Sequence, residues 1–367
     1  MGEPAAALDQ VRDQVSCVLS EFLDRQRVVA AGIAGELTPA IDAVADVLAG
    51  GKRLRAAFCY WGWRGASGEA QVAAEGGAGA AGVFAVAAAL ELLHAAALVH
   101  DDVLDDSDTR RGGPTIHRSF AARHAASGWR GEAQPFGKKI AIVLGDLLLA
   151  WADELFGGSG LPAAALGRGR PVLDLMRTEL MAGQYLDLLE QAAGTGGVAG
   201  ALRVLTYKTA KYTIERPLHL GAALAGPGDA DPALLRGYSG YGIPLGVAFQ
   251  LRDDILGVFG DPAETGKPAG DDVREGKRTV LAAVARERAT ARQAAALDRL
   301  LGDASIGAAG IAEFRGLVVD TGAVEACEVM IGRYVTEALD ALAAAPVTAE
   351  ARAALAGLAV AATARAG

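Results

Sequence analysis

The sequence is poor in cysteine, in aromatic residues and in positive charge. Three cysteines occur in 367 residues, without CxxC spacing, which excludes a disulfide framework and a structural zinc site and favours a reducing compartment. Aromatic residues make up 5% although 51% of residues are hydrophobic, so the core must consist mainly of Ala, Leu and Val. The formal net charge of -9 argues against non-specific nucleic-acid binding, which needs a basic surface.

Signals for secretion and for membrane insertion are also missing. Residues 1–10 lack the basic segment of a secretory signal peptide. The longest apolar stretches are interrupted by Glu91, His94 and Asp146, so we expect no membrane span. Together these absences predict a soluble, cytoplasmic protein.

Strand-like alternation of β-branched and aromatic residues is equally hard to find, whereas Ala and Leu head the helix propensity scale. We therefore predict an all-α protein. No linker is long or polar enough to separate two domains, so one domain is expected over residues 1–367, with an Ala-rich helical C-terminal part at 281–367. Helices are expected up to about Leu48 and over 81–105, 172–191, 200–224 and 232–259, with loops over 65–79, 127–137, 157–171 and 257–276.

The first chemical signal is the cluster Asp101-Asp102-Val103-Leu104-Asp105, at the end of an apolar helical run. Because positions i and i+4 share a helix face, Asp101 and Asp105 can present their carboxylates together. Such close like charges are costly unless a multivalent cation lies between them, and ligation by oxygen alone indicates Mg²⁺ rather than Zn²⁺. Acidic groups at this end also oppose the helix dipole, and such local violations are typical of functional sites.

A second cluster, Asp253-Asp254-Ile255-Leu256-Gly257, follows another apolar run. Gly257 cannot ligate a metal, although Asp253 remains and Asp261 lies further along the chain. If the two clusters faced each other, they would form a magnesium-binding site. The ligand usually bound through magnesium at such a site is a diphosphate.

Basic residues follow both clusters. Arg110 and Arg111 come after the first, while Lys267 and Lys277 come after the second. Guanidinium groups bind phosphate oxygens through paired hydrogen bonds, so this arrangement suits an anionic ligand. A solvated acidic helix end neutralised by arginines is the simpler alternative. His94 lies two helical turns before Asp101 on nearly the same face, and it is either a buried core residue or part of the site.

Taken in order and spacing, these residues resemble the trans-isoprenyl diphosphate synthases of the polyprenyl synthetase family, most of all the bacterial geranylgeranyl diphosphate synthases. The resemblance extends over about residues 45–280, which we regard as the motif-bearing core. It is carried by Gly51 to Arg55 (GKRLR), Glu91 to Asp105, Arg110-Arg111-Gly112, Lys208-Thr209, Phe249 to Asp254, and Thr265-Gly266-Lys267.

The resemblance implies an isoprenoid synthase fold, in which antiparallel helices surround a central cavity, and usually a homodimer. It also implies a trans-prenyltransferase that condenses isopentenyl diphosphate head-to-tail with an allylic diphosphate (dimethylallyl, geranyl or farnesyl). About three Mg²⁺ ions would serve as cofactors. Neither a nucleic acid nor a membrane is an expected partner.

The same resemblance assigns roles to individual residues. The implied metal ligands are Asp101, Asp105 and Asp253, supported by Asp102 and Asp254. The implied contacts to the allylic diphosphate are Arg110, Gln184, Lys208, Lys267 and Lys277. The implied isopentenyl diphosphate site consists of Lys52, Arg55, His94 and Arg111. The groups expected to act at the developing carbocation are Lys208, Thr209, Tyr212 and Gln250.

Product length is expected to depend on Ala97 and Ala96, which lie four and five residues before Asp101. Short-chain members of the family commonly have an aromatic residue there, so alanines favour geranylgeranyl diphosphate or a longer product. Two alternatives remain open. A class I terpene cyclase would need an Asn/Ser/Glu metal triad in place of the second Asp-Asp pair. A non-catalytic regulatory subunit would usually lack one aspartate motif, and both are present here.

Overall fold

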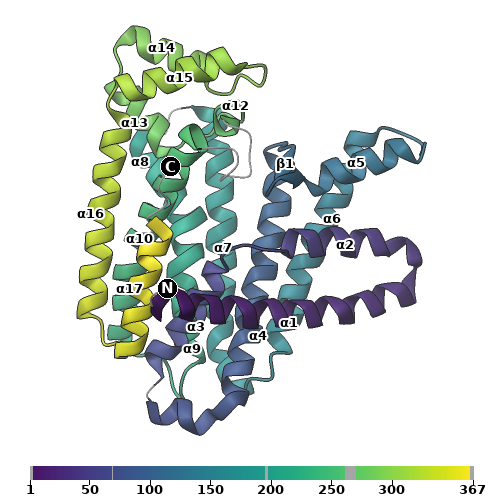
Figure 1. Ribbon diagram of the computed structural model, residues 1–367, viewed down its shortest axis with the longest axis vertical. Helices are drawn as coiled ribbons and strands as arrows, with labels where there is room; N and C mark the ends of the chain where they lie inside the picture. Colours follow the sequence, from purple (N-terminus) through teal and green to yellow (C-terminus); the bar gives the residue numbers. More distant parts are fainter. Residues whose placement is uncertain (1–2, 68, 195–196, 261–269, 364–367) are drawn as a thin grey trace. The chain divides into compact units, whose positions relative to one another are not determined.

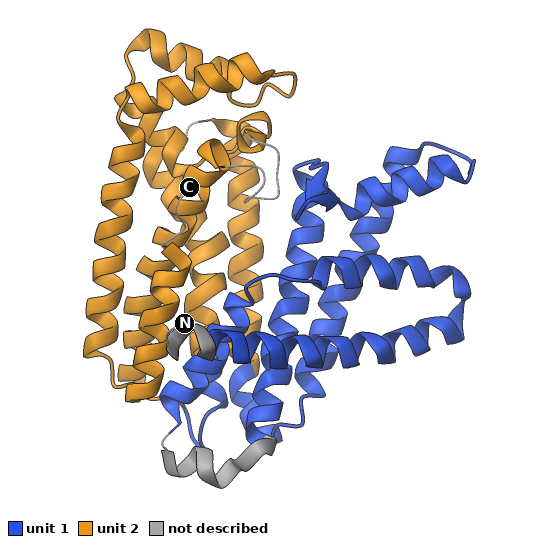
Figure 2. Ribbon diagram, in the orientation of Figure 1, with its two compact units in different colours: residues 1–169, 221–229 blue, residues 170–220, 230–367 orange. Residues whose placement is uncertain are grey.

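The computed structural model of the chain describes residues 3–67, 69–194, 197–260 and 270–363 (Figure 1). These residues are mostly helical, which confirms the all-α prediction. They form two compact units, residues 1–169 with 221–229 and residues 170–220 with 230–367 (Figure 2). The expectation of a single domain over residues 1–367 stays a prediction.

Unit 1 is built around one long buried helix, α4. This helix packs against α6, α3 and α1, and its side chains from Val83 to Leu93 are at most 9% exposed. A helix that is apolar on every side is stable only when other elements cover it, and these helices do so. The elements of unit 1 are α1 (Glu3–Ile33), the 3-10 helix η1 (Gly35–Leu37), α2 (Thr38–Leu48), α3 (Leu54–Ala66), α4 (Glu69–Leu104), β1 (Thr109–Arg110), β2 (Gly113–Pro114), α5 (Ile116–Ala126), α6 (Ala133–Gly157) and the end of α9 (Arg216–Leu224).

The expectation that no segment could span a membrane was wrong in its reasoning. Residues 79–104 of α4 are long and apolar enough to do so by length and composition, because Glu91 and His94 interrupt them too sparsely. In the structure, 83% of the most apolar window is buried. This burial marks α4 as a core helix.

Three expected loops are shorter than the sequence suggested or are absent. The loop at 65–79 is wrong, since α4 already begins at Glu69. Each glycine costs a helix about 1 kcal/mol, but the alanines between them favour it and the buried part of α4 continues directly from them. The loops at 127–137 and 157–171 are shortened because α6 begins at Ala133 and α7 at Ala163, with Pro171 inside α7.

Unit 2 is centred on α10. In Figure 1, α16 and α17 run alongside α10, and both contact it. Asp231 caps α10 by accepting a hydrogen bond from Ala233 N at 2.8 Å, with Pro232 at the first helical position. The elements of unit 2 are most of α7 (Ala163–Ala193), α8 (Gly197–Leu205), the π-helix η2 (Thr206–Glu215), the start of α9, α10 (Pro232–Phe259), α12 (Asp271–Arg274), α13 (Val280–Arg288), α14 (Ala291–Leu300), α15 (Ala308–Asp320), α16 (Ala323–Ala344) and α17 (Ala349–Thr363).

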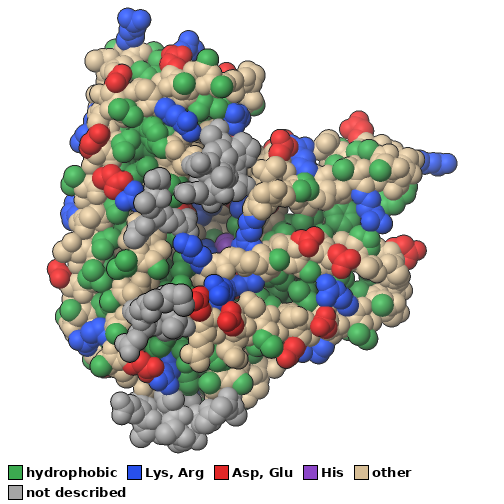
Figure 3. All heavy atoms as spheres, viewed as in Figure 1, with side chains coloured by type: hydrophobic (Ala, Val, Ile, Leu, Met, Phe, Trp, Pro, Cys, Tyr) green, Lys and Arg blue, Asp and Glu red, His purple; other side chains and the backbone are tan. Residues whose placement is uncertain are grey.

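The expected helix at 232–259 and the helical Ala-rich C-terminal part are both confirmed. On the face shown in Figure 3, acidic and basic side chains are interspersed over α1 and α2 instead of forming one basic surface.

Candidate active site

The first aspartate region lies at the C-terminal end of α4 in unit 1. Asp101 and Asp102 belong to the last turn of the helix, and Asp105 follows it with its amide bonded to the Asp101 carbonyl at 2.8 Å. The Asp102 side chain is 5% exposed, whereas that of Asp101 is 19% exposed. Asp101 is therefore the more accessible carboxylate of the two, and the metal-ligand roles of Asp101 and Asp105 stay predictions.

Arg110 is tied to this region. Its Nε and Nη2 lie 2.8 and 2.6 Å from the same oxygen of Asp102, and Nη2 is 3.9 Å from Asp101. Burial alone would lower the pKa of Arg110, but the hydrogen bond to Asp102 and the nearby carboxylates outweigh it and raise the pKa. Asp102 thus orients Arg110, and its supporting role at a metal site stays a prediction.

Arg111 occupies a tight hairpin turn between β1 and β2. Both Arg111 (φ 51°) and Gly112 (φ 79°) have the positive φ that a two-residue type I′ turn requires. Arg111 Nη1 donates to the carbonyls of Val47 and Ala49 at 2.9 and 2.8 Å, which end α2. These bonds satisfy carbonyls that the helix leaves open, and they hold the arginine in place.

A cationic cluster of Arg53, Arg55 and Arg111 acts on His94, and Lys52 adjoins Arg53 in the chain. Burial, followed by the charges of Arg55 and Arg111, lowers the pKa of His94 well below its ordinary value of 6.5, so the imidazole is neutral at pH 7. Burial also lowers the pKa of Arg111, and Arg53 and Arg55 contribute to that shift. Cations that destabilise one another in this way favour an anionic ligand, as the isopentenyl diphosphate assignment requires.

The two alanines before Asp101 differ in exposure. Ala97 is half-buried and shares a face with Asp101 one turn away, whereas Ala96 is fully buried. Leu90, further along the side that carries Ala97 and Asp101, is also fully buried. Ala97 is therefore the more accessible of the two predicted product-length positions.

The second aspartate region lies in unit 2, near the end of α10. Asp254 is 6% exposed and accepts a hydrogen bond from Gln250 Nε2 at 2.9 Å. Burial, followed by the charges of Asp272 and Asp253, raises the pKa of Asp254 to about 7. Burial and the neighbouring carboxylates therefore disfavour a further negative charge on Asp254 unless a cation lies nearby.

Gly257, the departure from the usual motif, is explained by Asp272. A Cβ added to Gly257 would lie 1.9 Å from Oδ2 of Asp272, so this carboxylate occupies the space that a third aspartate side chain would enter. Lys277, a predicted phosphate contact, lies 3.3 Å from the other oxygen of Asp272. Sequence reasoning missed Asp272 because its contact is made through α12. Asp261 and Lys267 lie outside the described residues.

Lys208 and Thr209 lie in the π-helix η2, where the sequence predicted an ordinary helix. Lys208 Nζ is 2.7 Å from Asp187, and the Thr209 hydroxyl donates to Gln250 Oε1 at 2.9 Å. A bonded chain thus runs from Thr209 through Gln250 to Asp254. π-helical turns occur frequently at functional sites, where they change the direction of side chains.

The other predicted site residues described in unit 2, Gln184 and Tyr212, are partly and fully buried, respectively. Gln184 is half-buried on α7, and Tyr212 is 2% exposed. A Cβ at Gly183 would lie 2.5 Å from Lys208 N, so α7 and η2 approach each other closely there. The roles of Gln184 and Tyr212 stay predictions.

A buried polar network that the sequence did not indicate holds the far end of η2. Glu179 on α7 accepts from Arg216 at 2.6 and 2.8 Å and from Lys211 at 2.9 Å. Burial raises the pKa of Glu179, but these hydrogen bonds outweigh it and lower the pKa overall. The one hint in the sequence was the i, i+4 pair of Lys211 and Glu215, which are 3.3 Å apart.

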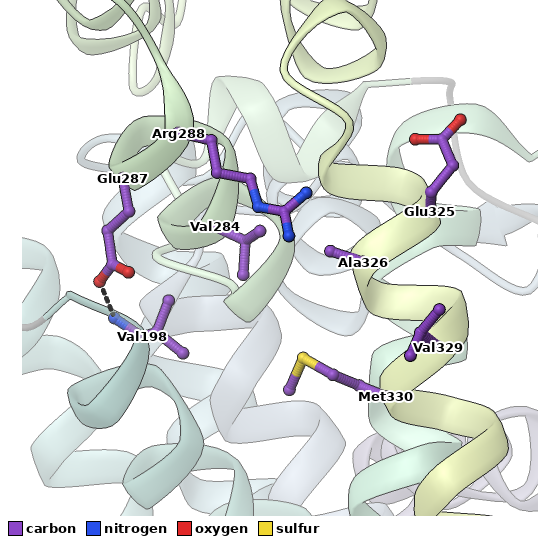
Figure 4. Close-up of a pocket in the computed structure, with 8 residues that line it drawn as sticks. All are labelled: Val198, Val284, Glu287, Arg288, Glu325, Ala326, Val329 and Met330. Atoms are coloured by element: carbon purple, nitrogen blue, oxygen red, sulfur yellow. Dashed lines mark hydrogen bonds between the residues drawn. The ribbon is translucent and has the colours of Figure 1, made fainter.

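A groove of about 520 Å³ between α8, α13 and α16 lies elsewhere in unit 2 (Figure 4). Its walls are mainly apolar, and Glu287 at its edge accepts a hydrogen bond from Val198 N at 3.1 Å. None of the predicted site residues lines it. The groove therefore does not coincide with the chemistry indicated by the aspartate regions.

The carboxylates suit magnesium only in part. Within the described residues, no group of three or more His, Cys, Asp or Glu side chains is arranged to hold a metal alone. Each aspartate region offers oxygen donors, and proteins commonly hold Mg²⁺ through one or two carboxylates together with substrate phosphates. The donor set fits magnesium that arrives with a diphosphate. That the two clusters face each other stays a prediction.

These features define a helical prenyltransferase of the trans class, with two aspartate regions and a cationic cluster. The sequence model of the family described as Polyprenyl synthetase matches residues 38–314, and the chain belongs to this family. The predicted fold and enzyme class are thereby confirmed.

The chain is also similar to proteins named as geranylgeranyl or geranylfarnesyl diphosphate synthases. A crystal structure of geranylgeranyl pyrophosphate synthase from Corynebacterium glutamicum, complexed with isoprenyl diphosphate and magnesium, is 42% identical, with a TM-score of 0.91 over 98% of this chain and 99% of that one. Geranylgeranyl diphosphate synthase from Mycobacterium tuberculosis is 33% identical over 80% of this chain and 76% of the relative. Geranylfarnesyl diphosphate synthase from Aeropyrum pernix is 32% identical over 71% and 76%, respectively.

Proposed function

We propose that the protein is a magnesium-dependent geranylgeranyl diphosphate synthase, which adds isopentenyl diphosphate to allylic diphosphates. The observation that carries the proposal is that each unit retains its part of the machinery. Unit 1 has the first aspartate region beside the cationic cluster, and unit 2 has the second aspartate region bonded to the Lys208-Thr209 turn. The similarity to the Corynebacterium structure, which holds an isoprenyl diphosphate and magnesium, supports the same substrate class.

The residues divide the chemistry between two diphosphates. Asp101 and Asp105 of unit 1 and Asp253 of unit 2 would each serve as magnesium ligands, and magnesium would neutralise the negative charge that develops on the departing allylic diphosphate. Arg110 and Lys208 would bind the oxygens of that diphosphate, each already oriented by an aspartate of its own unit.

The second diphosphate, that of isopentenyl diphosphate, would lie in the cationic cluster. Lys52, Arg55 and Arg111 supply positive charge there, and the neutral imidazole of His94 can donate one hydrogen bond. This site orients the alkene that attacks the allylic carbocation. We assign the proton released after the attack to the departed diphosphate, since no described side chain stands out as a general base.

Thr209 and Gln250 would stabilise the carbocation. Because the Thr209 proton is donated to Gln250, the hydroxyl oxygen keeps its lone pairs available to a positive charge. Water must be excluded during this step, since it would capture the cation.

Product length rests on Ala97. A small side chain on the Asp101 face leaves room for a growing isoprenoid tail, which favours geranylgeranyl diphosphate over a farnesyl product. The Mycobacterium relative is a geranylgeranyl diphosphate synthase, while the Aeropyrum relative is a geranylfarnesyl diphosphate synthase, so the longer product is the alternative to test.

We further propose a homodimer through α7. Apolar side chains on one side of this helix are exposed, including Tyr185 at 68% and Leu189 at 50%. A second copy presenting the same stripe would bury them in a two-fold interface. Analytical ultracentrifugation tests this: the wild type should sediment as a dimer and Tyr185→Asp/Leu189→Asp should sediment as a monomer, whereas a monomeric wild type would contradict the proposal.

Product analysis tests the enzymatic proposal. The purified protein is incubated with Mg²⁺, labelled isopentenyl diphosphate and either dimethylallyl, geranyl or farnesyl diphosphate, and the products are dephosphorylated and sized. Geranylgeraniol is expected from each primer, and chelation of Mg²⁺ should abolish it. Absence of elongation with every primer would disprove the synthase assignment and favour a regulatory subunit, while cyclic hydrocarbons would indicate a terpene cyclase.

A further inference from the structure

Unit 1 contains an ion pair, Arg53–Glu91, neither member of which is assigned as a direct contact of either diphosphate. Arg53 Nη1 lies 3.2 Å from Glu91 Oε2, and the two side chains are 6% and 4% exposed. Arg53 also donates through Nη2 to the carbonyl of Leu48. The pair therefore joins the end of α2, the start of α3 and the middle of α4.

Stability alone is a poor explanation for this pair. Arg53 Nε and Glu91 Oε1 are buried without a hydrogen-bond partner among the described residues. Burying two charges costs free energy that their attraction recovers only when the remaining polar atoms are also satisfied. Apolar residues of similar volume often replace such pairs without loss of stability.

The position of the pair relates it to the cationic cluster. Arg53 precedes α3 in a left-handed conformation (φ 51°, ψ 40°), which is unfavourable for a side chain other than glycine. Lys52 and Arg55 lie on either side of this turn. Glu91 lies three residues before His94, so the two are neighbours on the surface of α4. The ion pair thus connects the turn that carries Lys52 and Arg55 to the helix that carries His94.

Glu91 also opposes the repulsion within the cluster. Burial and the charges of Arg53, Arg110 and Arg55 lower the pKa of Arg111, whereas the charge of Glu91 raises it. A carboxylate buried beside several arginines allows them to remain close before an anion binds. Its removal would let the arginines move apart, so that the site would no longer be arranged for an anion before it binds.

We propose that the Arg53–Glu91 pair is a positioning element of the isopentenyl diphosphate site, which fixes Lys52 and Arg55 relative to His94. The inference rests on the proposed assignment of these three residues to isopentenyl diphosphate. Because the pair acts on one of the two substrates, its loss is expected to affect one Michaelis constant and not the other.

Steady-state kinetics of Glu91→Gln in the full-length enzyme tests the proposal. The KM for isopentenyl diphosphate should rise at least about tenfold, while kcat and the KM for the allylic diphosphate stay within about twofold. Glu91→Asp keeps the charge and should recover part of the affinity. Asp298→Asn is the matched control, since it breaks the exposed Arg286–Asp298 pair of 2.8 Å and should change neither KM.

A double variant keeps the test decisive if Glu91→Gln fails to fold. Arg53→Met/Glu91→Leu removes both charges together, which leaves no unpaired buried charge, and it should show the same selective rise in KM. Equal increases in both KM values, or an unchanged KM for isopentenyl diphosphate in a folded variant, would overturn the proposal. Lys52→Ala distinguishes a wrong positioning role from a wrong substrate assignment. If it also leaves the KM for isopentenyl diphosphate unchanged, the assignment of this site to isopentenyl diphosphate is wrong.

Discussion

The two aspartate regions begin with the same Asp-Asp pair, but their surroundings balance the negative charge differently. In the first region, Asp102 is paired with Arg110 at 2.6 Å, and further arginines lie nearby. In the second, Asp254 is bonded to the neutral Gln250, and burial together with neighbouring carboxylates raises its pKa to about 7. The same Asp-Asp motif therefore occurs in two electrostatic settings. The groups around the aspartates decide how strongly each region needs a cation.

Removal of one aspartate from each region should have the largest effect. Asp101→Ala and Asp253→Ala are each expected to lower kcat about a thousandfold, because each removes a proposed ligand of the magnesium that would neutralise the departing diphosphate. Circular dichroism should show unchanged helical content, and Asp298→Asn should keep wild-type turnover. If either variant retained most of its activity, that region would not be a metal site.

The contact between Gly257 and Asp272 belongs to the second region alone. Changing it should lower kcat by less than the removal of an aspartate does. Gly257→Asp should lower kcat about tenfold, which corresponds to a barrier higher by about 1.4 kcal/mol. The reason is that its Cβ would lie 1.9 Å from Oδ2 of Asp272, so that the Asp272 carboxylate must move. Gly257→Asp/Asp272→Gly relieves the clash and should recover activity and Mg²⁺ dependence. Higher activity in Gly257→Asp alone would show that Asp272 does not occupy the place of the third aspartate.

Product length offers a test confined to the first region. Ala97→Phe places an aromatic ring on the Asp101 face and should shift the product from geranylgeranyl to farnesyl diphosphate, with little change in the consumption of geranyl diphosphate. Chromatography of the dephosphorylated products measures the shift. Ala97→Ser adds little volume and should leave the product unchanged; an unchanged product in Ala97→Phe would place the limit on tail length elsewhere.

Local signals predicted most of the helices and the places of the two aspartate motifs on them, while the roles of the site residues stay predictions. The period of apolar residues located α10 to the residue, and the i, i+4 spacing of Asp101 and Asp105 placed both at the end of α4. The contacts that distinguish this chain depend on residues far apart in sequence or on backbone geometry. Asp272 fills the space beside Gly257, Glu91 reaches Arg53, and η2 departs from the α-helix without a residue pattern that announces it. Composition also misled, because the glycines in the first part of α4 suggested a loop.

Disruption of the polar network at the end of η2 is expected to change kcat least of all these substitutions. Its main effect should be on the free energy of unfolding. Glu179→Gln leaves Arg216 and Lys211 facing a neutral amide, which should lower the free energy of unfolding by about 3 kcal/mol at pH 7. Urea unfolding followed by circular dichroism measures the difference. Glu313→Gln, which breaks an exposed pair with Arg299, should cost less than about 1 kcal/mol.

The pH dependence of this difference identifies its cause. The native pKa of Glu179 lies below its ordinary value of 4.5, so its stabilising charge is fully present above that value and is lost as the pH falls through the native pKa. The gap between wild type and Glu179→Gln should therefore shrink below about pH 4.5. A gap that stayed constant down to low pH would mean that Glu179 acts through its shape rather than its charge. In that case the end of η2 would be held by packing, whereas Arg110 in the first region is held by its ion pair with Asp102.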